Sequence, residues 1–171
     1  MNVNQQLSQA IAEQYGAALK MLENTITSCQ TELWEDAKRE PVVSQVVYHT
    51  LFFIDLYLSK DSDERENFQG KLGEDYLGER TDGMGWEKIY SKKELLDYLG
   101  DIRQKATARF ANLTLDELQD ESLFDWHGSS VLSSLLYNLR HIMLHVGALH
   151  VRLNRVAKEP LKWVSKAPVV S

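Results

Sequence analysis

The sequence predicts an all-α protein, a four-helix bundle, and three observations support this fold class. Apolar residues recur at spacings of three and four in three separate segments, which is the period of an amphipathic helix, and a fourth segment is apolar on almost every side. Serine and threonine residues stand where helix caps are expected, often three positions before a glutamate. With 171 residues, 43% of them hydrophobic, the chain has the size of one domain, so we expect a single domain over residues 1–171.

The first two helices are expected over residues 5–29 and 42–58. The first shows the helical spacing clearly, and Pro41 is placed to open the second, because an early helical position needs no amide donor. The second segment is apolar on almost every side, which predicts a helix buried by its neighbours. Its β-branched residues leave a strand open as the alternative, but seventeen residues are many for a strand.

A long connection is expected over residues 59–90, which are polar, charged and rich in glycine. A stretch of this length either carries function or crosses from one end of a bundle to the other. Ser91 and Glu94 form a capping-box pattern at the start of a third helix, which we expect to reach Phe110.

The last helix is expected to begin after Ser129 or Ser130 and to reach about Val156. A short turn before it is predicted to be capped by Thr114. We expect the final residues, 160–171, to be a loosely attached tail.

Composition and charge exclude several classes of function. There are 19 basic and 25 acidic residues, a net charge of −6, and the basic residues are scattered, which argues against nucleic acid as a partner. The first thirty residues lack the pattern of a secretion signal, and no window holds the ~18 consecutive apolar residues of a membrane span. Cys29 is the only cysteine, so an internal disulfide and cysteine-based metal sites are ruled out. We expect a soluble, cytoplasmic protein.

Three histidines are candidate metal ligands. His141 and His145 are four residues apart, which places them about 40° apart on one helical face, with Cβ atoms about 5–6 Å apart. His49 shares its face of the second helix with apolar residues and is expected to point inward, where it needs a polar partner. A solvated histidine pair and a core histidine bonded to a carbonyl or a tyrosine hydroxyl are the alternatives. Three imidazoles holding one ion, with positions left for water, form the open site of reactive metals, and zinc, nickel, iron or copper would suit it.

The remaining polar residues near these positions are weaker candidates. His150 lies on nearly the opposite side of the last helix and is excluded, and His127 is expected to face solvent rather than to overhang a pocket. Asn138 could be a hydrogen-bond partner behind the ligands, with a surface amide as the alternative. Tyr48 and Tyr137 flank the ligand positions and either line a cavity or belong to the core.

The segments VYHTLFFIDLYL (47–58) and LLYNLRHIMLHVGALHVRLNR (135–155) resemble the DinB-like superfamily of metal-binding four-helix bundles. The resemblance extends over nearly the whole chain. It implies an up-down-down-up bundle with its long connection between the second and third helices, and a metal held by His49, His141 and His145. It also implies that the protein is a homodimer. No DNA-binding role is carried over.

For activity, the resemblance implies a metal-dependent enzyme that acts on a small molecule as a thiol-dependent transferase or a hydrolase. Arg152 is then a candidate contact for an anionic, low-molecular-weight thiol cofactor, whereas the catalytic residues are unknown, because no general base stands beside the histidines. Family members often have Gly-Gln after the last ligand, whereas this chain has Gly147-Ala148. Two other functions remain open: a non-catalytic metal-binding or stress-response protein whose ion braces two helices, and a metal-free bundle that acts through protein partners.

Overall fold

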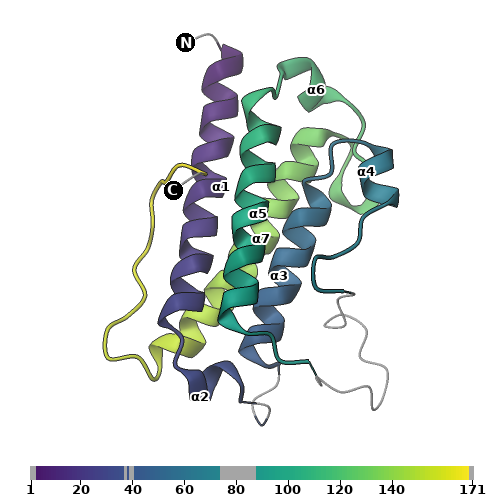
Figure 1. Cartoon of the computed structure of the whole chain (residues 1–171). Helices are drawn as coiled ribbons and strands as arrows, with labels where there is room; N and C mark the ends of the chain where they lie inside the picture. The colour runs from purple at the N-terminus through teal and green to yellow at the C-terminus, as the bar shows by residue number, and fades with distance from the viewer. Residues whose placement is uncertain (1–2, 37, 39–40, 74–87, 170–171) are drawn as a thin grey trace.

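The computed structural model describes residues 3–36, 38, 41–73 and 88–169, and this part of the chain is helical apart from turns, loops and one isolated bridge between Glu121 and Ser130. The all-α prediction is therefore confirmed. The helices are α1 (Val3–Ser28), α2 (Thr31–Trp34), α3 (Val43–Tyr57), α4 (Ser62–Glu66), α5 (Lys92–Ala111), α6 (Leu115–Gln119), the 3₁₀ turn η1 (Asp125–His127) and α7 (Val131–Asn154) (Figure 1).

The four long helices pack against one another around a shared apolar core. α1 contacts α5 and α7, and α3 contacts the same two helices on the other side. Each contributes fully buried side chains to one continuous cluster, for example Leu19, Ile54, Leu95 and Ile142, all 0% exposed. Burial of such side chains is the main source of folding free energy. Within the described ranges, no helix has both the length and the hydropathy of a membrane span.

The capping signals read from the sequence are largely confirmed. The side chain of Ser91 accepts a hydrogen bond from the backbone of Glu94, whose own side chain accepts one from the backbone of Ser91. Thr114 caps α6, and Ser130 caps α7. Pro41 is not in the first turn of α3, because the residue after it has extended backbone and is itself the cap, so the helix begins two residues later than Pro41.

The expected connection 59–90 is not wholly irregular. It contains α4, which is capped by Asp61 through a hydrogen bond from the backbone of Glu64. Residues 74–87 lie outside the described residues. Helices as short as α2 and α4 are missed by a periodicity analysis, because one turn of helix is too short to show the period.

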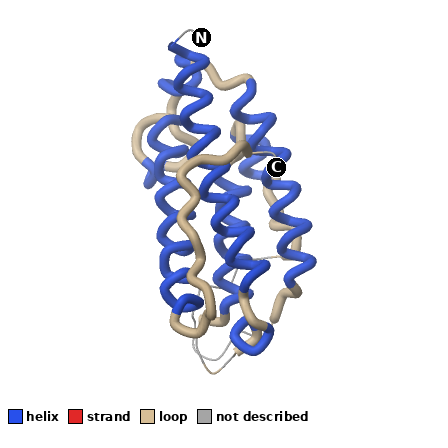
Figure 2. Tube along the Cα trace, turned by 90° about the vertical axis from the view of Figure 1, so that its left-hand side faces the viewer, coloured by secondary structure: helices blue, strands red, loops and turns tan. Residues whose placement is uncertain are grey.

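The C-terminal tail packs against the helices, so the expectation of a loose attachment was wrong. The described part of the segment runs back along the bundle beside α1, as the yellow trace in Figure 1 and the tan tube in Figure 2 show. Gly16 makes the close approach possible, since a Cβ there would lie 2.0 Å from the carbonyl oxygen of Ala167. The carbonyl of Val169 accepts a hydrogen bond of 2.8 Å from Arg103, and the Val169 side chain is 6% exposed.

Candidate metal centre

The structure brings the three predicted histidines together at the contact between α3 and α7. His141 and His145 are one turn apart on α7, and His49 faces them from the middle of α3. All three are half-buried. They are also the only His, Cys, Asp or Glu side chains that gather into a possible ion-binding group within the described part of the chain.

The imidazoles meet through their Nε2 atoms. The Nε2 of His141 lies 3.3 Å from that of His49 and 3.1 Å from that of His145, and all three ligand atoms lie within 4.8 Å of one another. Two nitrogens bound tetrahedrally to one ion at about 2.0–2.1 Å are separated by about 3.3 Å. The two pairs that His141 forms, with His49 and with His145, are therefore already spaced as nitrogen ligands of a first-row ion would be.

Hydrogen bonds alone satisfy the Nε2 of His141 poorly in this arrangement, because it lies between two other imidazole nitrogens. Each Nε2 carries either one proton or one lone pair, never both. The Nε2 of His141 faces the other two, so it can form one well-directed hydrogen bond with only one of them. A cation that binds all three lone pairs satisfies every Nε2 at once.

The protonation state of His141 suits a ligand. Burial, followed by the like charges of His145, His49 and His127, lowers its pKa to about 3. The ring is therefore neutral at physiological pH, and one of its nitrogens has a free lone pair. Its Nδ1 atom is buried and has no hydrogen-bond partner in the described part of the chain.

Aromatic rings surround the histidines on the α3 side. Phe53 lies 4.8 Å from the ring of His49 and 5.6 Å from that of His141, measured between centroids, and Tyr57 lies 6.1 Å from His141. Such rings lower the local dielectric constant and strengthen electrostatic interactions at the site. The earlier view of His49 as an inward-pointing core residue needs correction, because one stripe of α3 stays partly exposed, including His49 and Phe53.

His127 is the residue that the sequence analysis placed wrongly. It was expected to face solvent, but it is 6% exposed, lies in η1 and covers the first turns of α7. Its ring stacks on Tyr137 with centroids 4.0 Å apart, and its Nδ1 lies 2.7 Å from the hydroxyl oxygen of Ser134. Burial lowers the pKa of His127 to about 4, with a smaller contribution from Arg140.

The other candidates lie around this centre without joining it. Asn138 is fully buried, and its amide nitrogen donates to the carbonyl of Ile54 at 3.4 Å, so its role behind the ligands stays a prediction. Arg152 donates to the carbonyl of Pro41 at the start of α3. His150 lies beside the backbone of Met21 in α1, away from the three ligands as expected.

The two tyrosines that flank the ligand positions have different surroundings. Tyr48 is 1% exposed and stacks on Tyr90 at 4.2 Å, so it belongs to the core. Tyr137 lies 5.8 Å from Tyr57 and belongs to the aromatic group beside His141.

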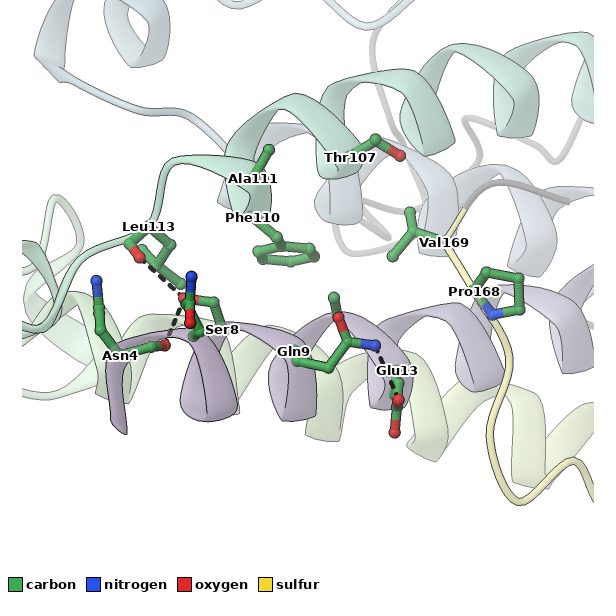
Figure 3. A pocket seen from close by; sticks show the side chains of 12 residues that line it. Asn4, Ser8, Gln9, Glu13, Thr107, Phe110, Ala111, Leu113, Pro168 and Val169 are labelled. Atoms are coloured by element: carbon green, nitrogen blue, oxygen red, sulfur yellow. Dashed lines mark hydrogen bonds between the residues drawn. The ribbon is translucent and has the colours of Figure 1, made fainter. Parts of the chain in front are cut away.

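A separate cavity of about 530 Å³ lies between α1, the end of α5 and the C-terminal tail (Figure 3). Phe110 and Val169 form part of its apolar wall, while Gln9 and Glu13, which hydrogen-bond each other, line its polar side. None of the residues that line it belongs to the histidine cluster. The candidate metal centre and this cavity are therefore different places on the molecule.

No family model, curated protein or solved structure matches the chain. The functional argument therefore depends on the geometry and chemistry of the site itself.

Proposed function

We propose that His49, His141 and His145 bind one divalent transition metal ion in an open site, and that the protein is a metal-dependent enzyme acting on a small molecule. The convergence of three Nε2 atoms carries this proposal: that of His141 lies 3.1 and 3.3 Å from the other two, and all three lie within 4.8 Å of one another. The donor set fits zinc, nickel or iron, since neutral imidazole is a common ligand for each of them.

Three protein ligands are typical of catalytic sites, whereas structural sites usually have four. Within the described residues, no carboxylate or thiolate joins the three histidines. Such an ion supplies Lewis acidity, which lowers the pKa of a bound water or thiol. The protein's own residues hold the ion between α3 and α7 and limit the access of water through Phe53 and Tyr57.

The reaction we favour is a thiol-dependent transfer, with hydrolysis as its close relative. This choice follows from the resemblance to DinB-like proteins, which the segments around His49 and 135–155 carry. Arg152, in the last turn of α7, is the proposed contact for an anionic thiol cofactor, because a cation at a helix C-terminus is favourably placed and can also attract an anion.

We further propose that the fold is an up-down-down-up four-helix bundle of the DinB-like kind. The contact pairs support it, because α1, α5, α3 and α7 form a closed ring of neighbours. The long connection between α3 and α5 also supports it: both helices begin at the lower end of Figure 1, so the chain has to return there between them.

Metal content tests the central proposal. Protein purified without an affinity tag would be analysed by mass spectrometry for metals, comparing the wild type with His49→Ala, His141→Ala and His145→Ala. His150→Ala is the matched control, because it removes a histidine from α7 that lies beside α1. We expect about one ion per chain in the wild type and in the control, and a strong loss in the three ligand variants. A wild type that neither contains nor takes up metal would refute the proposal.

In the alternative function, the protein is not catalytic and the ion braces α3 against α7. The ligands come from both helices, which favours this alternative. Cobalt(II)-loaded protein would be titrated with 2-mercaptoethanol while its absorption spectrum is recorded. A new sulfur-to-cobalt charge-transfer band indicates an exchangeable position and supports an enzyme. An unchanged spectrum, together with a large loss of thermal stability in chelator, supports the bracing function.

A further inference from the structure

His127 holds a buried polar atom that needs a partner. Its Nδ1 is engaged by Ser134 at 2.7 Å, but its Nε2 is inaccessible to solvent and has no hydrogen-bond partner in the described part of the chain. Buried polar atoms without partners are rare in native proteins, because they lose their hydrogen bonds to water on folding. Several other buried side-chain atoms in the described residues also have no partner, and His127 differs from most of them because it contacts Tyr57, whose ring also lies near the metal ligand His141.

The metal centre contains a second atom of the same kind. The Nδ1 of His141 is also buried and without a partner in the described ranges. A histidine that binds metal through one nitrogen nearly always donates the proton on its other nitrogen to an acceptor, which fixes the ring and raises its basicity. His141 therefore requires an acceptor on its Nδ1 side.

The two atoms belong to the same aromatic group. The ring of Tyr57 contacts His127 at 4.2 Å and lies 6.1 Å from His141, measured between centroids. Tyr137, on which His127 stacks, lies about one helical turn before His141 on α7. The site of His127 is thus built on the same face of α7 that carries the metal ligand.

The hydrogen-bonding roles of the two rings are complementary. If His127 donates its Nδ1 proton to Ser134, its Nε2 is left with a lone pair and is an acceptor. If His141 directs its Nε2 lone pair toward the ion, its Nδ1 carries the proton and is a donor. Each ring therefore offers what the other lacks, and a water molecule is the ordinary bridge between groups too far apart for direct contact.

We propose that His127 is a positioning residue of the metal centre, whose Nε2 accepts the Nδ1 proton of His141 through one bridging water. This inference rests on the proposed metal site and extends it to a chain of Ser134, His127 and His141. The chain orients the His141 ring toward the ion. Because His127 belongs to η1, the way in which η1 packs on α7 controls the affinity of the site for metal.

The first experiment determines the proton position on His127. A two-bond ¹H–¹⁵N correlation spectrum of zinc-loaded protein distinguishes the two neutral tautomers. We expect the Nδ1–H form for both His127 and His141. An Nε2–H form at His127 would overturn the proposal, because that nitrogen would then be a donor facing another donor.

The second experiment measures zinc affinity by competition with a chromophoric chelator in the wild type, His127→Phe and His127→Gln. We expect His127→Phe to weaken binding about 10–100-fold, the usual effect of removing a partner of a ligand. His127→Gln should recover most of the loss, because its amide oxygen can accept in place of Nε2. The cobalt absorption band should shift in His127→Phe and return in His127→Gln.

The outcomes separate this inference from the proposed function. Equal affinity in the wild type and His127→Phe would overturn the role of His127 while leaving the metal site intact. Equal losses in His127→Phe and His127→Gln would show that His127 acts only by packing, which also overturns it. A wild type that binds no zinc would overturn the proposed function first.

Discussion

The buried, neutral state of His127 makes the stability of the protein depend on pH. Burial lowers its pKa in the folded protein from 6.5 to about 4, whereas the unfolded chain keeps the ordinary value. Between these two values the unfolded state binds more protons, so acid favours unfolding. The stability contributed by the neutral ring is fully present above pH 6.5 and is lost progressively as the pH falls toward 4.

The size of the effect follows from linkage. A folded pKa of about 4 against 6.5 gives a loss of about 1 kcal/mol between pH 7 and pH 5.5, and of about 3 kcal/mol between pH 7 and pH 4. His127→Gln removes this titration but leaves His141 and the other ionisable groups in place. The free energy of unfolding of the variant should therefore fall less steeply with acid than that of the wild type, by about 1 kcal/mol at pH 5.5.

Urea unfolding followed by circular dichroism at several pH values measures this difference, in the presence of a chelator so that metal binding does not add its own pH dependence. Equal m values in the two proteins are the control that the same surface is exposed on unfolding. Parallel curves of stability against pH would refute the reasoning, because a solvent-exposed His127 would titrate alike in both states.

Three further predictions address the tail, the ion and the assembly. Gly16→Ala should displace the tail, because the new Cβ would lie 2.0 Å from the carbonyl oxygen of Ala167. We expect the free energy of unfolding to fall by an amount on the order of 1–3 kcal/mol and trypsin to cleave faster after Lys162. An unchanged digest would contradict the docking of the tail. Removing metal with a chelator should lower the melting temperature of the wild type. Starting from free metal at a hundred times Kd, the loss of unfolding free energy should be about 2.7 kcal/mol. The melting temperature of His145→Ala should not change with chelator. The homodimer implied by the resemblance would place exposed apolar residues of α7 at its interface, among them Leu144, whose side chain is 68% exposed. Leu144→Glu should therefore convert the dimer to a monomer, which light scattering would detect as a mass of 19.7 kDa. A wild type that is already a monomer would argue against the dimer.

The sequence was most informative where the geometry lies within one helix. The four-residue spacing of His141 and His145 determines their common face, and the structure places their Nε2 atoms 3.1 Å apart. The position of His49 relative to the other two histidines could not be derived from spacing in the same way. It depends on the register between α3 and α7, which is set by the packing of many side chains. Two arguments pointed to it: an imidazole expected to point into the core needs a polar partner, and the resemblance implies that His49 is a ligand.

The sequence was least informative where backbone turns set the tertiary contacts. Gly128 has a φ of +107°, a conformation that side chains rarely allow, and this turn joins η1 to the start of α7. The burial of His127 therefore depends on a turn that has no helical period to reveal it. The docked tail depends likewise on Gly16, which in sequence is only a glycine inside a helix.

The metal-free function faces a physical difficulty that the metal site does not. Without an ion, the ring of His141 stays neutral at neutral pH, because burial, followed by the like charges of His145, His49 and His127, lowers its pKa to about 3. Its Nε2 would then offer a single proton or lone pair toward two nitrogens at 3.3 and 3.1 Å, so it could form a well-directed hydrogen bond with only one of them. Folding would still have to hold three half-buried side chains in this arrangement against their conformational entropy. A bound cation removes both costs, because it satisfies the three lone pairs together and adds its binding free energy to the stability of the fold.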